Sequence, residues 1–112
     1  MTDALVQPRK YHRYRLEVPV IFSWTDAQGI RKKQVGLTRD ISVGGAFVFA
    51  TPPPPLDANI KLKGFVPSGG QVPSVRMFGK GQVVRMESAP SSLPAGFAIA
   101  GGRIVFRKWA EN

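Results

Sequence analysis

Asp40-Ile41-Ser42-Val43-Gly44-Gly45 is the stretch around which this chain of 112 residues is organised. It supplies a carboxylate, a hydroxyl and two residues without side chains, and five apolar residues, 46–50, follow it directly. An uninterrupted apolar run of that length is consistent with a buried strand. We therefore expect a tight polar element at residues 40–45 that interrupts a sheet just before a core strand.

Short apolar segments separated by turn residues recur on both sides of this stretch. Residues 18–25 alternate between apolar and other side chains, which predicts a strand with one apolar face, and residues 26–29 supply the Asp and Gly of a hairpin turn. Further strands are expected over 30–38, 46–50, 59–66, 74–87 and 95–100. Their expected core residues are Ile60, Leu62, Phe65, Val75, Met77, Val83 and Val84, with Gly79 and Gly81 as bend or bulge points.

About six short strands and no internal helical period predict an all-β fold, an antiparallel sheet that closes into a small barrel. The 12 Gly and 10 Pro residues of the chain support the many turns that such a fold requires. We expect Gly101-Gly102 to end the last strand. After it, Ile104, Val105 and Trp109 could form one face of a short C-terminal helix, so we expect at most one short helix in the chain.

Length and composition indicate one globular domain, with 43% hydrophobic residues and a formal charge of +9 that concentrates anionic partners. We expect residues 1–8 to be a flexible leader and residues 9–112 a single domain. The chain has no cysteine, no apolar core of signal-peptide length at its start and nothing near the roughly 18 apolar residues of a membrane span. These features predict a cytoplasmic protein without membrane insertion.

A basic run, residues 9–15, precedes the first expected strand and holds four basic residues, one His, two Tyr and no acid. A solvated basic arm is one interpretation. The two Tyr favour a more ordered role, because an aromatic ring beside Arg can support a flat ring system or hold the arm against the barrel.

Asp40 and Ser42 are two residues apart, so on an extended segment both side chains address the same object. A guanine base suits them, since a carboxylate accepts its N–H donors and Arg engages O6 and N7 bidentately. Gly44 and Gly45 would let the backbone approach a ligand closely or adopt a positive φ. Each residue also has an interpretation without a ligand, as a self-capping turn or an ordinary chain reversal.

The order Arg9-x-x-x-Arg13, strand hairpin, Asp40-x-Ser42-x-x-Gly45 resembles the PilZ domain, the bacterial receptor module for cyclic di-GMP, whose signature motifs are RxxxR and (D/N)xSxxG. Residues 81–85 and 96–99 are similar to the two closing strands of that family. The resemblance covers roughly residues 9–106. It implies a six-stranded antiparallel β-barrel whose flexible N-terminal arm folds over the ligand.

The resemblance also implies site roles. Arg9 and Arg13 would contact guanine edges and phosphate, with Lys10 as a phosphate partner, and the ligand would often be an intercalated dimer. Asp40 and Ser42 would hydrogen-bond guanine, while Gly45 keeps the turn open. Family members differ in the strand residue that supports the outer base, and here Arg85 or Met86 would lie near it. The expected ligand-binding residues are Arg9, Lys10, Arg13, Asp40, Ser42, Gly44, Gly45 and Arg85.

We expect a receptor that relays the signal to a protein partner. Two alternatives stay open: an interaction module that ignores nucleotide, and a general single-stranded nucleic-acid binder, a partner we rank below cyclic di-GMP. An enzyme is not expected, because His12 is the only histidine, cysteine is absent and the acidic residues are scattered. These residues assemble neither a nucleophile with its base nor a metal or cofactor site.

Overall fold

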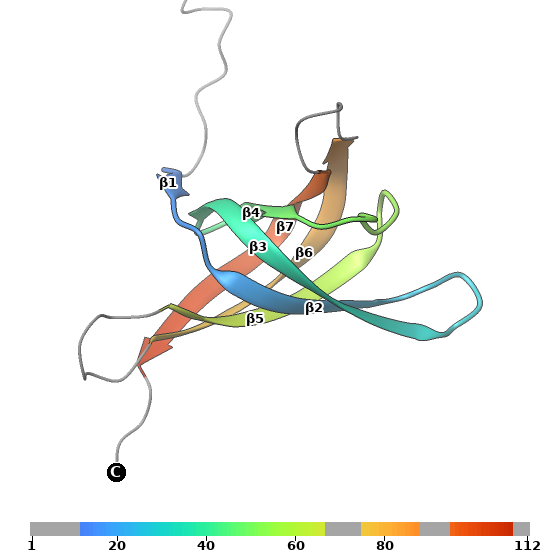
Figure 1. The fold of residues 1–112 in the computed structure, drawn as a ribbon, viewed down its shortest axis with the longest axis horizontal. Helices are drawn as coiled ribbons and strands as arrows, with labels where there is room; N and C mark the ends of the chain where they lie inside the picture. Colours follow the sequence, from blue (N-terminus) through green and yellow to red (C-terminus); the bar gives the residue numbers. More distant parts are fainter. Residues whose placement is uncertain (1–11, 67–74, 88–94, 109–112) are drawn as a thin grey trace, which may run out of the picture.

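A computed structural model describes residues 12–66, 75–87 and 95–108, and the structural statements below concern these ranges. They form seven strands and no helix (Figure 1). No helix that could cross a membrane is found in these three ranges. The strands are β1 (Tyr14–Arg15), β2 (Pro19–Thr25), β3 (Arg31–Ser42), β4 (Gly45–Phe49), β5 (Asn59–Val66), β6 (Val75–Glu87) and β7 (Gly96–Lys108).

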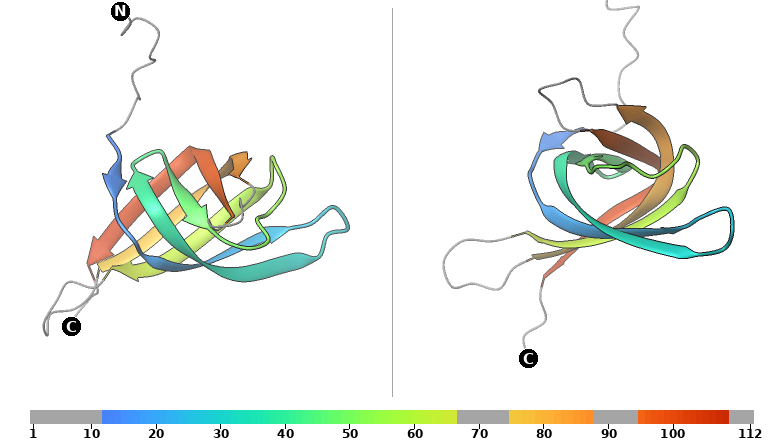
Figure 2. Two further views of the ribbon diagram at one scale, coloured as in Figure 1. Left: turned by 45° about the horizontal axis from the view of Figure 1, so that its top comes forward. Right: turned by 45° about the vertical axis from the view of Figure 1, so that its right-hand side comes forward.

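The strands form one antiparallel sheet in the order β1-β3-β2-β5-β6-β7-β4, and an additional pairing of β3 with β4 closes it. Six strands therefore make a barrel, and β1 is an extra strand that pairs with the C-terminal end of β3. Figure 2 shows the sheet curling round on itself. The predicted all-β, six-stranded antiparallel barrel is confirmed.

The core is built from the alternating positions of the strands, as the sequence pattern predicts. Val18, Val20 and Phe22 are buried, and the ring of Phe22 packs edge-on against Phe97 with 5.0 Å between centroids. The other strands contribute inward-facing side chains to the same cluster, among them Ile41, Val48, Ile60, Leu62, Met77, Val83, Ile99 and Ile104.

The turn between β2 and β3 forms as predicted from its Asp and Gly. The N–H of Gly29 donates to the carbonyl of Asp26 at 2.9 Å, and Asp26 Oδ1 accepts from the N–H groups of Gln28 and Ile30. Gly29 adopts a φ of 83°, which favours glycine.

The prediction that Gly101-Gly102 ends the last strand is wrong, and no helix follows it within the described residues. β7 continues to Lys108, and Gly101 and Gly102 form a bulge opposite Gly81. Gly101 has a φ of 79°, and a Cβ on Gly102 would lie 1.8 Å from the carbonyl oxygen of Lys80. The glycine pair therefore allows the strand to bend and pass close to β6 without ending. Trp109 lies outside the described residues.

Two further expectations need correction. Residues 40–45 do not interrupt the sheet, since β3 runs to Ser42, β4 starts at Gly45, and these two residues pair across the turn. Phe65 and Val84 are not core residues, as 52% and 54% of them are exposed. Strand alternation turns Phe65 away from the buried Leu62, and Val84 sits in a bulge beside the buried Val83.

Candidate ligand-binding site

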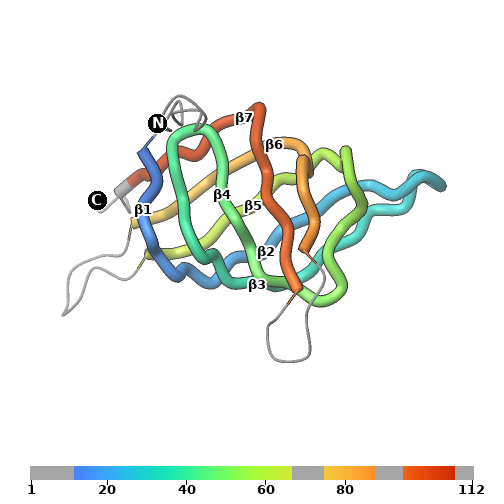
Figure 3. Tube along the Cα trace, turned by 90° about the horizontal axis from the view of Figure 1, so that it is seen from above, coloured from blue at the N-terminus to red at the C-terminus, as the bar shows by residue number. Residues whose placement is uncertain are grey.

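The strand β1 places the N-terminal segment beside the end of β3. Tyr14 pairs with Ile41 and Arg15 with Asp40. Seen from above, β1, the β3–β4 hairpin and β7 lie next to one another (Figure 3). The described end of the basic run, residues 12–15, and the polar stretch are therefore neighbours in the structure although they are far apart in sequence.

A buried threonine fixes the chain between β1 and β2. Thr38 Oγ1 accepts a 2.8 Å hydrogen bond from the N–H of Val18 and donates to the carbonyl of Leu16. The N–H of Leu16 in turn donates to the carbonyl of Arg39 at 3.2 Å. These bonds satisfy backbone groups that the gap between β1 and β2 would otherwise leave unpaired. They also set the position from which Arg13 reaches β3.

Arg13 and Asp40 form an ion pair between Nη2 and Oδ1, although 27 residues separate them. The other carboxylate oxygen of Asp40 accepts a 2.8 Å hydrogen bond from Nε of Arg39. Only 9% of Asp40 is exposed. A nearly buried carboxylate is thus held by two guanidinium groups.

The pKa of Asp40 is lower than its usual value. Burial acts to raise the pKa of this carboxyl, but hydrogen bonds from Arg13 and Arg39 and the positive charges of both residues lower it and prevail. Asp40 is therefore ionised at neutral pH. An ionised carboxylate accepts hydrogen bonds on both oxygens and donates none.

Arg39 is a residue that the sequence analysis missed. Its guanidinium lies 3.9 Å from the ring centroid of Phe47, and its Nη1 is 3.9 Å from Oε1 of Glu87. The register of β3 against β4 shifts between Thr38 and Asp40, so Arg39 is a bulged residue whose side chain can reach its neighbour. In a regular strand adjacent side chains point to opposite faces, so alternation predicts no contact between Arg39 and Asp40. The one signal in the sequence was that an arginine directly precedes the motif aspartate.

Ser42 and the glycines shape the turn between β3 and β4. Ser42 Oγ accepts from the N–H of Gly44 at 3.3 Å and donates to the carbonyl of Gly45 at 3.4 Å. The N–H of Ile104 donates to the carbonyl of Val43 at 2.9 Å, which ties the turn to β7. The hydroxyl of Ser42 thus makes the self-capping contacts that the sequence analysis left open as an alternative.

Gly45 is required by close packing. Neither Gly44 nor Gly45 has a positive φ, so that expectation is wrong for both. A Cβ on Gly45 would lie 2.1 Å from the carbonyl oxygen of Ile99 in β7, closer than any side chain can approach. The backbone of β4 therefore runs directly against that of β7 at the end of the turn.

A groove of about 620 Å³ lies between the turn, the C-terminal part of β6 and residues 98–102 of β7. The register of β6 against β7 shifts between Val83 and Arg85, and this bulge leaves both Val84 and Arg85 exposed at the groove. Arg85 also lies 3.4 Å from Glu87 through Nη2 and Oε2. The residues lining the groove are Arg13, Ser42, Gly44, Gly45, Ala46, Val84, Arg85, Ala98, Ile99, Ala100, Gly101 and Gly102.

Five predicted site residues, Arg13, Ser42, Gly44, Gly45 and Arg85, therefore line one groove. Asp40 is not part of the lining but is bonded to Arg13. Arg9 and Lys10 lie outside the described residues. The sequence analysis did not predict that Val84, Gly101 and Gly102 line the groove. For the two glycines, the one signal in the sequence was that they are adjacent.

The groove suits an anionic ligand with a flat ring system. Arg13 and Arg85 present guanidinium groups, which bind phosphate or the acceptor edge of a base bidentately. The small side chains of Ala98 and Ala100 and the bare backbone of Gly101-Gly102 leave room for a ring to lie against the strand.

Comparison with known proteins agrees with this geometry. The PilZ domain family matches residues 7–102, which include the basic run, the turn and most of the barrel. No curated protein matches the sequence. PilZ domains are known as receptors of cyclic di-GMP and are generally non-catalytic binding modules. With its matching barrel and sequence, this chain belongs to the PilZ domain family.

Proposed function

We propose that this protein is a receptor that binds cyclic di-GMP in the groove between Arg13 and Arg85. The observation that carries the proposal is the ion pair of Arg13 with Asp40, which joins the two signature motifs at one wall of the groove. A guanine-containing cyclic dinucleotide matches the groove chemically, because it combines flat bases with phosphate charge.

Each predicted residue has a role in this proposal. Ser42 accepts a hydrogen bond from an N–H group of one guanine in the groove. Asp40 lies behind Arg13 and accepts from the same base once Arg13 turns to the ligand, since a carboxylate keeps lone pairs beyond those used by the two arginines. Arg13 engages phosphate and the O6 and N7 acceptors, and Arg85 supports an outer base. Arg9 and Lys10 add phosphate contacts from the N-terminal arm. An intercalated ligand dimer would bring four phosphates to these cations.

The proposed relay of the signal uses the N-terminal arm. The backbone from Tyr14 to Val18 is fixed to β3, so ligand contacts at Arg9 and Lys10 would order the preceding chain over the groove. Ordering a segment on binding converts ligand affinity into a changed surface. A protein partner in the cytoplasm would recognise that surface.

Isothermal titration with cyclic di-GMP tests this function. We expect saturable heat for the wild type, a ligand-to-protein ratio that reports whether one or two nucleotides bind, and a strong loss in Arg13→Ala. The matched control is Arg103→Ala, which removes the same charge from a residue that does not line the groove. Wild-type protein that gives no heat would favour the interaction module that ignores nucleotide.

A further inference from the structure

The outer face of the sheet carries a second group of basic side chains, away from the groove at Arg13. The strand register places Lys33 of β3, Ser23 of β2, Lys61 of β5, Lys80 of β6 and Arg103 of β7 in one row across five strands. Directly opposed residues in antiparallel strands share a face and lie about 5 Å apart. Four cations therefore follow one line across the outside of the barrel.

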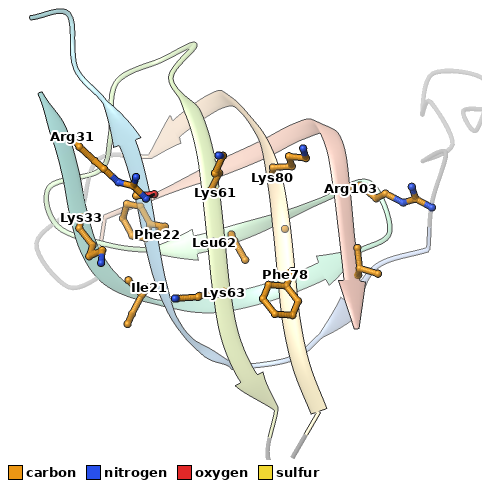
Figure 4. A pocket seen from close by; sticks show the side chains of 13 residues that line it. Ile21, Phe22, Arg31, Lys33, Lys61, Leu62, Lys63, Phe78, Lys80 and Arg103 are labelled. Carbon is orange, nitrogen blue, oxygen red and sulfur yellow. Dashed lines mark hydrogen bonds between the residues drawn. The ribbon is translucent and has the colours of Figure 1, made fainter. Parts of the chain in front are cut away.

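The neighbouring row of side chains on this face is apolar except for one lysine. It contains Val35, Ile21, Lys63, Phe78 and Val105, again in register across the same five strands. Phe78 is 36% exposed and Ile21 is 41% exposed, so the centre of this face offers an aromatic ring and aliphatic surface to solvent. Figure 4 shows Phe78, Lys63 and Ile21 beside the row that contains Lys61 and Lys80.

A second exposed ring lies diagonally from Phe78. Phe65 is paired with Arg76, one row further along β5 and β6, and the guanidinium of Arg76 lies 5.7 Å from the centroid of the Phe65 ring. Phe65 and Phe78 therefore sit on neighbouring strands of the same outer face.

These side chains line two adjoining hollows, of about 390 and 440 Å³, which share Ile21, Lys63 and Phe78. None of the described residues lining them is acidic. Within the described ranges, none of the lysines here forms an ion pair, and neither does Arg103. The charges of these lysines and of Arg103 thus have no ion-pair partner in the described part of the chain.

We propose that this face is a binding surface for single-stranded nucleic acid, distinct from the groove at Arg13. Lys61, Lys80 and Arg103 would contact successive phosphates, and Phe78 would stack against an unpaired base. Basic grooves with exposed aromatic rings bind single strands in this way, because every base offers a π-face. A second copy of this chain is a poor occupant, since each copy carries a formal charge of +9.

Fluorescence anisotropy with a fluorescein-labelled 15-mer of deoxythymidine tests the proposal, with the full chain and salt from 50 to 200 mM. With three phosphate contacts, the slope of log K against log salt should be about −2, and each of Lys61→Gln and Lys80→Gln should reduce its magnitude by about 0.7. Lys32→Gln is the matched control. Lys32 is exposed on the same strand as Lys33 but faces the other side, opposite Trp24, and should leave affinity unchanged.

The stacking part of the proposal has its own variant. Phe78→Leu keeps an apolar side chain but removes the ring, and we expect about 10-fold weaker binding with an unchanged salt slope. An unchanged melting curve of this variant shows that the barrel still forms. Tyrosine at the same position should restore the affinity.

Four results would overturn this assignment. The first is no binding of the 15-mer at 50 mM salt, and the second is wild-type affinity of Phe78→Leu for the 15-mer. The third is that polyglutamate of the same charge, or phosphatidylserine vesicles, compete for the protein as well as unlabelled 15-mer does. The fourth is displacement of the 15-mer by cyclic di-GMP, which would place the oligonucleotide in the Arg13 groove instead. Retained binding in the presence of all three competitors supports the outer face as a separate site.

Discussion

Nε of Arg39 donates a 2.8 Å hydrogen bond to Oδ2 of Asp40, its neighbour in β3. Adjacent residues of a regular strand point to opposite faces, and the bulge between Thr38 and Asp40 removes that constraint. Asp40 is therefore held on both oxygens, by Arg39 within its own strand and by Arg13 from the N-terminal segment. The packing of Arg39 on the ring of Phe47 fixes the donor in place.

Replacing Arg39 should weaken cyclic di-GMP binding although this residue does not line the groove. In Arg39→Gln, Asp40 loses a charge-assisted hydrogen bond of about 1.5–3 kcal/mol, so we expect roughly 10-fold lower affinity by titration calorimetry. An NMR titration should show a raised pKa of the Asp40 carboxyl, since one of the groups that lower it is gone. Arg107→Gln, on the outer face of β7, is the control for a lost charge. Unchanged affinity and pKa in Arg39→Gln would show that Arg13 alone orients the carboxylate.

Asp40 should make stability depend on pH in acid. Its pKa in the folded protein lies below the usual value of 3.8, so its contribution to unfolding free energy is fully present above about pH 4 and is lost as pH falls through the folded pKa. The stability difference between wild type and Asp40→Asn should therefore be largest near neutral pH and shrink below pH 4. Urea unfolding from pH 2 to 7 measures it. A difference that stays constant over this range contradicts the linkage.

Removing the hydroxyl of Thr38 should loosen the N-terminal segment. Thr38→Val leaves the N–H of Val18 and the carbonyl of Leu16 without their shared partner, which costs about 1–3 kcal/mol of unfolding free energy. We also expect faster amide exchange at Val18 and weaker binding of cyclic di-GMP. Thr25→Val, at an exposed position of β2, makes the same chemical change and should alter stability by less than about 0.5 kcal/mol. Equal effects of the two variants would refute the anchoring role.

An alanine at position 45 should disturb both fold and site. The new Cβ would collide with the backbone carbonyl of Ile99, which cannot rotate away, so Gly45→Ala should cost about 1–3 kcal/mol and weaken nucleotide binding. Gly29→Ala tests a different cause, because no atom lies within 4 Å of its added Cβ and only the positive φ opposes it. It should cost about 1 kcal/mol and leave nucleotide binding intact. Thermal unfolding and titration calorimetry on both variants distinguish a steric clash at the site from backbone strain in a distant turn.

Cyclic di-GMP should raise the thermal stability of the protein, whereas GTP and cyclic GMP at equal concentration should not. A ligand at 100 times its Kd stabilises the folded state by about 2.7 kcal/mol, which corresponds to a rise of several degrees in Tm for a domain of this size. A thermal shift assay measures the effect. A Tm that does not change when cyclic di-GMP is added would count heavily against the receptor function.

The sequence predicted the barrel well because local chemistry determines its parts. Alternation over residues 18–25 and the Asp and Gly of the turn at 26–29 each depend on near neighbours in the chain. Prediction from the sequence failed where a bulge or the facing of a side chain depends on the partner strand. The glycines at 101 and 102 do not end β7, since their bulge is accommodated by β6, and Phe65 points outward because the register of its strand decides its face.

The site shows the same division. The motifs at residues 9–13 and 40–45 predicted which residues would lie together. Of these, the structure brings Arg13, Ser42, Gly44 and Gly45 to one groove, and Asp40 stands behind Arg13. The role of Arg39 could not be predicted, since it arises from a bulge that exists only when β3 pairs with β4.

By itself, the sequence determined the fold class, the barrel strands and the two motifs of the site, because hydrophobic alternation and turn chemistry act over a few residues. Only the tertiary structure decided which residues meet across strands: Arg13 with Asp40, Arg39 with Phe47, and the line of cations from Lys33 to Arg103. The physical reason is that strand register and bulges are set by pairing between distant segments, and a shift of one residue moves every side chain to the other face.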